Sequence, residues 1–126
     1  MQKKAVFSEN APKAIGPYSQ AIAYGDLLFC SGQLGVDMST GKLAEGVSAQ
    51  THCSMKNLGA VLAANGMDYS NILKTTIFVT DLKDFAAVNV AYGEYLSGDM
   101  PARACVQVAA LPLGGLVEIE CIAARG

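Results

Sequence analysis

Charged residues are scarce in this sequence. Lys, Arg, Asp and Glu make up 16% of the 126 residues, and the formal net charge is −2, whereas a soluble domain averages about 25% charged residues. A weakly acidic chain without a basic cluster lacks the electrostatic surface that binds nucleic acids. No run approaches the ~20 apolar residues that span a bilayer, and the N-terminal MQKKAVFSEN is too polar for a signal peptide. We therefore expect neither nucleic acid nor a membrane as a partner.

Metal-ligating residues are scarce as well. The single histidine, His52, is adjacent to Cys53, and none of the four cysteines forms a C-x-x-C pair. Neighbouring residues on a helix point about 100° apart and rarely bind the same ion. A zinc site is therefore not expected, and His52 is predicted to lie on a helix surface. Scattered cysteines without a disulfide framework are typical of reduced cytoplasmic proteins, so we predict a cytoplasmic location.

Apolar residues, by contrast, are abundant. They make up 52% of the chain, whose length of 126 residues is close to that of one typical domain. We expect a single domain over residues 1–126. The surplus of apolar surface predicts either a large core or a second apolar surface that another chain covers.

Hydrophobic periodicity predicts six strands and two helices. Alternating or β-branched stretches predict strands at 3–8, 18–24, 27–34, 71–80, 102–109 and 116–124. Helical spacing predicts helices at 47–65 and 84–97, with Gly66 just beyond the end of the first. The segment 35–46 is predicted to be a loop. The order β-β-β-α-β-α-β-β predicts an α+β fold, in which a mixed β-sheet has two helices packed on one face.

The strand predicted at 71–80 is apolar on both of its faces. Ile77 and Val79 point to one side, and Phe78 points to the other. Two helices cover only one face of a sheet, and the sequence contains no third helix. We therefore expect the second face to be covered by self-association.

The two C-terminal strands carry the residues best suited to chemistry. Alternation places Arg103 and Cys105 on one face of the first, and Glu118 and Glu120 on one face of the second. If the two strands form an antiparallel pair, a carboxylate lies near Arg103. That arrangement is either a buried ion pair or part of a site, and the residues alone leave both interpretations open. No nearby histidine activates Cys105, so a small wall residue is favoured over a nucleophile.

The stretches IGPYSQ and SGQLG add hydroxyl groups to this inventory. Tyr18 follows a Gly-Pro turn, and Ser31-Gly32 lies towards the end of the strand at 27–34. Each is compatible with ordinary turn chemistry. Hydroxyl groups and a backbone exposed at Gly32 also suit a small carboxylate ligand, provided that an arginine is close.

Four stretches taken together resemble the RidA (YjgF-type) imine deaminase family: IGPYSQA, FCSGQLGVD, ILKTTIFVTDLKDFAAVNVAYGEY and MPARACVQVAALPLGGLVEIECIA. The resemblance covers nearly the whole chain, in the family's order and spacing. It implies the chorismate-mutase-like α+β fold and a homotrimer with its sites in the clefts between subunits. It also implies hydrolysis of 2-imino acids, which are reactive products of pyridoxal-phosphate enzymes, to 2-oxo acids and ammonia. The resemblance implies no metal and no organic cofactor.

The resemblance further implies roles for single residues. The family's carboxylate-binding arginine corresponds to Arg103, and the acidic residue beside its hydrolytic water corresponds to Glu118. Its pocket tyrosine, serine and cysteine correspond to Tyr18, Ser31 and Cys105. Arg103 would hold the substrate carboxylate in its planar fork, and Glu118 would move protons through a bound water. We therefore expect these two residues to be catalytic.

A second function fits part of this pattern. A non-enzymatic trimer that binds small carboxylates, or acts as a chaperone-like regulator, would also use an arginine pocket. Glu118 distinguishes the two functions, because a carboxylate sensor needs no acid opposite its anchor. A chorismate mutase shares only the fold class, and one arginine is few for a dicarboxylate. The sequence names neither the preferred side chain of the imino acid nor the enzyme that supplies it.

Overall fold

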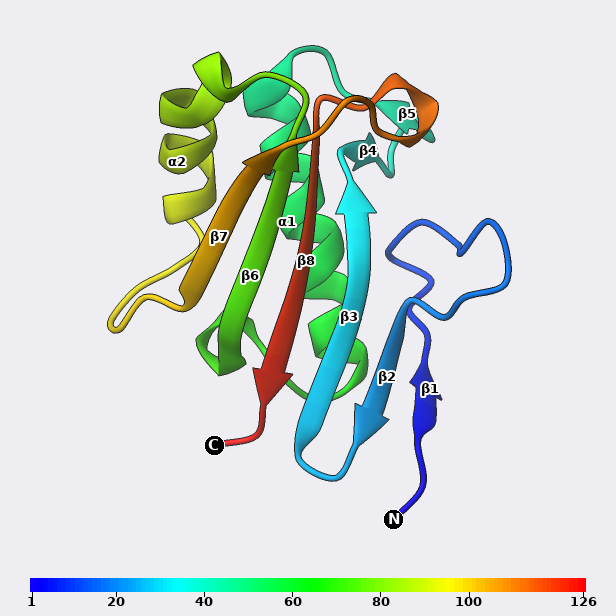
Figure 1. Cartoon of the computed structure of the whole chain (residues 1–126). Helices are drawn as coiled ribbons and strands as arrows, with labels where there is room; N and C mark the ends of the chain where they lie inside the picture. The colour runs from blue at the N-terminus through cyan, green and yellow to red at the C-terminus, as the bar shows by residue number, and fades with distance from the viewer.

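Six strands form one sheet, and two α-helices cover one of its faces (Figure 1). The computed structural model describes residues 1–126. The strands of this sheet are β1 (Lys4–Val6), β2 (Ala21–Tyr24), β3 (Leu27–Leu34), β6 (Ile72–Val79), β7 (Ala102–Gln107) and β8 (Val117–Ala124). The helices are α1 (Val47–Ala64) and α2 (Phe85–Gly93). The predicted α+β fold with two helices on one face is confirmed.

β6 separates the two C-terminal strands of the chain. The strand order is β1-β2-β3-β8-β6-β7. β6 and β7 are the one parallel pair, and α2 lies in the connection between them, whereas β8 is antiparallel to both β3 and β6. The interpretation that the strands at 102–109 and 116–124 pair with each other is therefore wrong. A helical crossover places β7 beside β6 in parallel, and β8 occupies the other side of β6.

Both helices begin close to the predicted positions but end earlier than predicted. α1 ends in a Schellman motif, in which the Met67 N–H donates to the Leu62 carbonyl (3.0 Å) and Gly66 has a φ of 69°. α2 ends at Gly93 because the next three amides bond to carbonyls three residues back, which tightens the chain. The capping glycine is thus confirmed, whereas the length of the second helix is not.

The strand boundaries differ most around the N-terminal loop. β2 begins only at Ala21, since the residues before it belong to that loop. The predicted loop at 35–46 contains a small hairpin of β4 (Val36–Asp37) and β5 (Lys42–Leu43). Single 3-10 turns complete the chain: η1 (Tyr69–Asn71), η2 (Leu82–Asp84) and η3 (Pro112–Gly114).

The core lies between the helices and one face of the sheet. It is one cluster of 19 buried residues, to which α1 contributes the fully buried Met55, Leu58 and Leu62. Ile77 of β6 and Ile119 of β8 are paired in register and are fully buried on the same face. Truncating side chains of this kind typically costs ~2–5 kcal/mol. This layer therefore fixes the sheet on which the candidate site is built.

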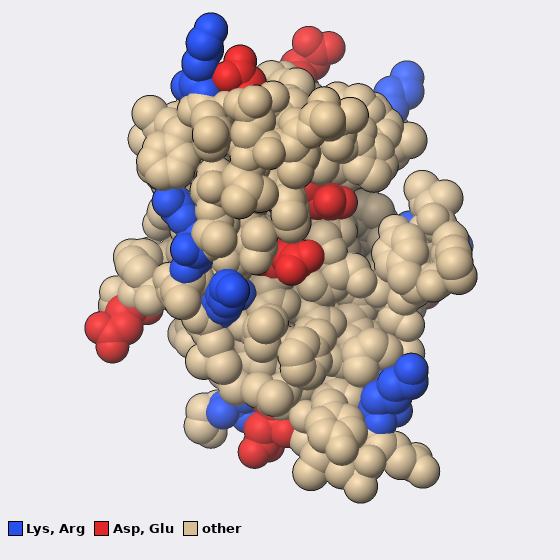
Figure 2. Space-filling view, in the orientation of Figure 1, with Lys and Arg blue, Asp and Glu red and all other residues tan.

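The other face of the sheet is not covered by this chain. The register places Phe29, Phe78 and Ile122 there, together with Glu118 and Glu120, and Phe29 is 45% exposed. Figure 2, drawn in the orientation of Figure 1, shows two acidic groups near the middle of a largely uncharged surface. A broad apolar face of this kind favours contact with another chain, as the apolar composition predicts.

Candidate active site

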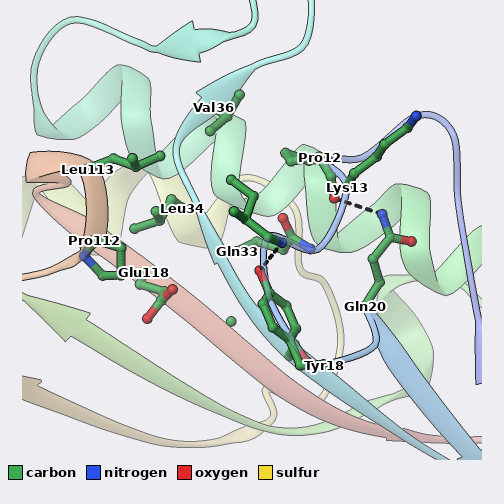
Figure 3. A pocket seen from close by; sticks show the side chains of 13 residues that line it. Pro12, Lys13, Tyr18, Gln20, Gln33, Leu34, Val36, Pro112, Leu113 and Glu118 are labelled. Carbon is green, nitrogen blue, oxygen red and sulfur yellow. Dashed lines mark hydrogen bonds between the residues drawn. The ribbon is translucent and has the colours of Figure 1, made fainter.

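A pocket of about 430 Å³ opens where the N-terminal loop lies beside β3 and the start of β8 (Figure 3). Its walls come from three segments. These are the loop at 12–20, the end of β3 and the start of β4 at 31–36, and the turn η3 with the start of β8 at 112–118. The volume lies in the range of small-molecule sites. Segments far apart in the sequence therefore meet at one cavity.

Glu118 supplies the only carboxyl side chain of this pocket. In β8 it pairs with Leu34 of β3 on one side and with Phe78 of β6 on the other. Burial raises the pKa of its carboxyl, and the nearby charge of Glu120 raises it further. A partly buried carboxyl with a raised pKa is suited to taking and returning protons near neutral pH.

A β-bulge in β3 places two predicted site residues beside this carboxyl. Between Cys30 and Gln33 the pairing of β3 with β8 shifts by one residue, and Ser31 and Gly32 lie in the bulge. The Glu118 side chain lies against Gly32, since a Cβ atom at residue 32 would come within 2.8 Å of the Glu118 Cδ. The bulge was not predicted from the sequence, although a glycine inside a strand is a recognised signal for one.

Two hydroxyl groups line the pocket together with Glu118. Ser31 Oγ donates to the Ser19 carbonyl (2.6 Å), which leaves its lone pairs available to accept. Tyr18 Oη accepts from the Ile15 N–H (3.3 Å; Figure 3), which leaves its own O–H available to donate. The pocket thus offers an acceptor at Ser31 and a donor at Tyr18 beside the carboxyl, and the sequence singles out both residues.

Buried glutamine side chains hold the loops around the pocket. Gln20 Oε1 accepts from the Ser8 N–H (2.6 Å), and its Nε2 donates to the Pro12 carbonyl (2.8 Å). Gln50 Oε1 accepts from the Leu116 N–H (2.9 Å), immediately before β8. The two glutamines are only 3% and 5% exposed. Neither role was predicted from the sequence, although a polar residue inside a predicted strand (Gln20) or a predicted helix (Gln50) is a signal that its side chain forms hydrogen bonds.

Arg103 lies outside this pocket, on the edge strand β7. Its register partner Thr75 is fully buried on the helix-covered side of the sheet, so Arg103 points to that side. Its Nη1 donates to Asn89 Oδ1 of α2 (2.6 Å). Its Cζ lies 5.3 Å from the ring centroid of Phe85 and 5.4 Å from that of Tyr92. Two aromatic faces and one amide therefore hold the guanidinium in a defined position.

Arg103 and Glu118 do not meet within one chain. They point to opposite faces of the sheet, from strands that β6 separates. No carboxylate lies within ion-pair distance of Arg103, so the interpretation as a buried ion pair is wrong. The Arg103 side chain is exposed, and a guanidinium with one hydrogen bond keeps further N–H donors for a ligand.

Cys105 also lies on β7, away from the pocket. It pairs with Ile77 and packs against the edge of the core. Burial raises the pKa of its thiol, and the charge of Arg103 offsets only part of that effect. A thiol of this kind is largely protonated at neutral pH, which agrees with a packing role rather than with that of a nucleophile.

The structure contains no group of three His, Cys, Asp or Glu side chains that could hold a metal ion. His52 is half-buried and not a free surface residue, because its Nδ1 lies 2.9 Å from the Tyr95 hydroxyl. No helix combines the length and the apolarity that a membrane crossing requires.

Similarity to known proteins extends over almost the whole chain. Residues 8–125 match the family model described as endoribonuclease L-PSP. The chain is similar to protein DfrA of Myxococcus xanthus, with 54% identity over 98% of this chain and 96% of the relative. It is also similar to the 2-iminobutanoate/2-iminopropanoate deaminase of Mus musculus, with 47% identity over 98% of this chain and 93% of the relative.

Solved structures agree with this relationship. The crystal structure of RidA from the Antarctic bacterium Psychrobacter matches the chain with a TM-score of 0.94 at 43% identity, over 97% of this chain and 99% of that one. Sequence and fold therefore agree over nearly the full length of both proteins. The chain belongs to the RidA (YjgF-type) family, which the endoribonuclease L-PSP model describes.

Proposed function

We propose that the protein hydrolyses 2-imino acids to 2-oxo acids and ammonia. The observation that carries this proposal is Glu118, a partly buried carboxyl with a raised pKa in a pocket that also contains Tyr18 and Ser31. Adding water to a C=N bond requires a group that takes a proton and later returns it, and such a carboxyl does both. The name of the mouse relative, 2-iminobutanoate/2-iminopropanoate deaminase, supports the same reaction.

Arg103 anchors the substrate and Glu118 carries the proton transfers in this proposal. Two parallel N–H···O bonds from the guanidinium fix the plane of the substrate carboxylate, and with it the adjacent iminium carbon. Glu118 takes a proton from water as the water oxygen bonds to that carbon and the C=N electron pair moves to nitrogen. Glu118 then donates this proton to the nitrogen, and the C–N bond breaks. Ammonia leaves as Glu118, now a carboxylate again, takes the proton of the hydroxyl group and the C=O bond forms.

The two pocket hydroxyls have complementary tasks in this reaction. Ser31 already donates its proton to a backbone carbonyl, so it accepts from the N–H of the iminium. Tyr18 donates its free O–H to the oxygen that adds to carbon. Gly32 leaves the space in which Glu118 and the substrate lie together. Cys105 contributes to the wall next to Arg103.

We propose further that Arg103 from a neighbouring copy completes each pocket, in a homotrimer. Within one chain, Arg103 and Glu118 point to opposite faces of the sheet. Arg103 lies on an edge strand, and the face that carries Glu118 is apolar and uncovered. A closed ring in which the edge of one copy meets the pocket of the next satisfies both features. The number of three copies rests on the family resemblance.

The description of the family model names an endoribonuclease, but the pocket supports a small substrate better. Recognition of RNA depends mainly on basic groups that contact phosphates. The chain has a net charge of −2, and the charged residues of the pocket are Lys13 and Glu118. A cavity of about 430 Å³ matches a small molecule.

The reaction is tested with imines that an amino-acid oxidase makes in situ. The imine that remains is trapped with an added nucleophile and quantified with the native protein or with heat-denatured protein. We expect the native protein to shorten the lifetime of the imine and to release 2-oxo acid and ammonia in equal amounts. Binding of a 2-oxo acid without any effect on the lifetime would contradict the deaminase. That result would favour the non-enzymatic carboxylate-binding or chaperone-like function.

The shared site is tested by mixing two inactive variants. Arg103→Ala and Glu118→Gln are co-expressed with different affinity tags, and mixed oligomers are isolated by sequential purification. If the two residues of a site come from neighbouring copies of a trimer, each isolated mixed trimer contains one intact site among its three, and activity returns to about a third of the parental level. No recovery in verified mixed oligomers would place both residues of each site on one copy.

We also propose a cytoplasmic location. All four cysteines are unpaired, and Cys53 and Cys105 are only partly buried. Thiols in such positions persist in a reducing compartment. Fractionation of cells that express the protein at its natural level tests this location.

A further inference from the structure

Leu113 adopts a backbone conformation that the chain otherwise reserves for glycine. Its φ is 60° and its ψ is 15°, whereas the other positive-φ residues are seven glycines. The left-handed region is strained for a residue with a Cβ atom. Strain of this kind persists where the surroundings impose it, and it clusters at functional sites. A leucine at this position therefore requires an explanation.

The turn around Leu113 is fixed on both sides. Pro112 begins it, and the Gly115 N–H donates back to the Pro112 carbonyl (3.0 Å). Gly115 lies tightly against Leu34, because a Cβ atom at residue 115 would be 2.8 Å from the Leu34 Cδ2. The hydrogen bond from the Leu116 N–H to Gln50 Oε1 holds the residue that links this turn to β8. The surroundings thus impose the backbone conformation, and glycine would adopt it without strain.

Burial in the core does not account for the leucine side chain. Leu113 is 68% exposed and does not belong to the core cluster. It lines the pocket that contains Glu118, and Figure 3 shows it beside Leu34 on the same side of the cavity. Val36 and Ile15 line the same pocket. The cavity therefore has an apolar wall next to its proton-transfer group, and Leu113 completes that wall.

We propose that Leu113 is a specificity residue whose side chain, together with Leu34 and Val36, receives the apolar side chain of the substrate. This inference rests on the proposed function and names its substrate class: 2-imino acids with branched or long aliphatic side chains, such as those derived from leucine or methionine. An alanine-derived imino acid carries only a methyl group and offers this wall little apolar surface to contact. The strained leucine is retained because glycine would remove the contact surface that binds the substrate side chain.

The test compares Leu113→Gly with the parent protein on two imines. For the leucine-derived imine, kcat/KM should fall by about tenfold, and for the alanine-derived imine it should change by less than about twofold. The melting temperature should not fall, because glycine relieves the strain and little buried surface is lost. The matched control is Leu82→Ala, which alters an exposed leucine outside the pocket (46% exposed) and should change neither value.

Equal losses for both imines, no loss for either, a lower melting temperature or a changed oligomer size would overturn the proposal. Such results would make Leu113 a structural or interface residue. Product binding supplies a readout that does not depend on catalysis. 4-Methyl-2-oxopentanoate should bind more tightly than pyruvate, and Leu113→Gly should reduce that preference.

The two readouts separate the specificity of the pocket from the proposed reaction. If the parent protein hydrolyses no imine but shows the binding preference, the reaction is wrong and the specificity assignment stands. If it hydrolyses imines and residue 113 has no effect on side-chain preference, the specificity assignment alone is wrong.

Discussion

Glu118 and Arg103 carry the two halves of the proposed site, and the chain holds them in different ways. Glu118 lies in a cavity lined by three segments of its own chain, with a strand bulge beneath it and buried glutamines fixing the surrounding loops. Arg103 lies exposed on an edge strand, where α2 holds it through an amide and two aromatic rings. Each half is therefore positioned by contacts within its own chain.

In the proposed reaction, this difference assigns the two tasks of catalysis to different parts of the sheet. The fold of one chain determines the environment of the proton-transfer group, including its raised pKa. The same fold places the guanidinium on the opposite face of the sheet, so in the proposed oligomer the packing of copies would set its distance from the carboxyl. Substitutions in the pocket should therefore alter chemistry within each copy, whereas substitutions at the edge strand should alter how the substrate is presented to that chemistry.

Removing the proton-transfer group should have the largest effect. Glu118→Gln keeps the size and hydrogen-bonding reach of the side chain but loses the basic oxygen, so turnover should fall by ~10²–10⁴-fold. Kinetics of imine loss measure the fall, and calorimetry should show that 2-oxo acids still bind. Glu120→Gln, on the same face but outside the pocket, should be much milder. Equal rates for the parent and Glu118→Gln would show that Glu118 does not transfer protons in the reaction.

The arginine half is tested by a change that keeps its charge. Arg103→Lys replaces a planar fork with a point charge on a flexible stem, which cannot impose the plane of the substrate carboxylate. Because a displacement of ~1 Å can cost about 10²-fold in rate, we expect a loss close to that of Arg103→Ala, with an unchanged oligomer by size-exclusion chromatography. Arg125→Lys is the matched control. Deamination near the parental rate in Arg103→Lys would show that charge alone suffices.

The bulge beneath the carboxyl is tested by adding one methyl group. Gly32→Ala introduces a Cβ atom that would lie within 2.8 Å of the Glu118 Cδ, so the carboxyl must move. We expect about a tenfold fall in kcat/KM from this displacement, with the fold intact by circular dichroism. Gly93→Ala, where an added Cβ meets no atom within 4 Å, should leave activity unchanged. Full activity of Gly32→Ala would mean that the position of the carboxyl is not critical.

The thiol next to the arginine should matter less than any of these groups. Because burial raises the pKa of the Cys105 thiol, little thiolate is present at neutral pH. Cys105→Ala should therefore keep kcat/KM within about threefold. Intact-protein mass spectrometry during turnover should find no adduct. A folded but inactive variant, or a covalent adduct at this residue, would restore the nucleophile hypothesis.

The smallest effect should appear in stability and not in rate. The pKa of Glu118 is raised above its ordinary value of 4.5, so the folded chain binds this proton more tightly than the unfolded chain. The carboxyl therefore lowers stability progressively as the pH rises from its ordinary pKa of 4.5 to its raised pKa in the folded chain; the cost is absent below this interval and constant above it. Glu118→Gln should melt slightly higher than the parent near pH 8, and the difference should vanish towards about pH 4. Calorimetry across this range would contradict the assignment if the difference did not depend on pH.

Local periodicity predicts much of this fold from the sequence. The β-branched alternation of β6 and the helical repeat of α1 each follow from neighbouring residues, so their positions were predictable within a few residues. The pairing of β7 with β6 instead of β8 was not predictable from alternation. Pairing depends on where a helical crossover returns the chain, and that is a property of the whole sheet.

The candidate site, too, was predictable only in part. Alternation placed Arg103 and Glu118 on defined strand faces, and the family resemblance supplied their roles. The bulge at Ser31, the buried Gln20 and the strained Leu113 escaped prediction. Each depends on contacts between segments that are distant in the sequence, and no local pattern encodes such contacts.

The glutamine bonds around the pocket have a consequence for motion. The Ser8 and Leu116 amides donate to side-chain oxygens of glutamines that are themselves almost fully buried. These amides can exchange hydrogen with solvent only when that part of the core opens. Although both lie in loops, they should exchange as slowly as amides of the adjacent strands, whereas the amide of Gly98, in an exposed loop and without a backbone acceptor, should exchange fast. In the proposed reaction, the substrate would then meet a cavity that keeps its shape between turnovers.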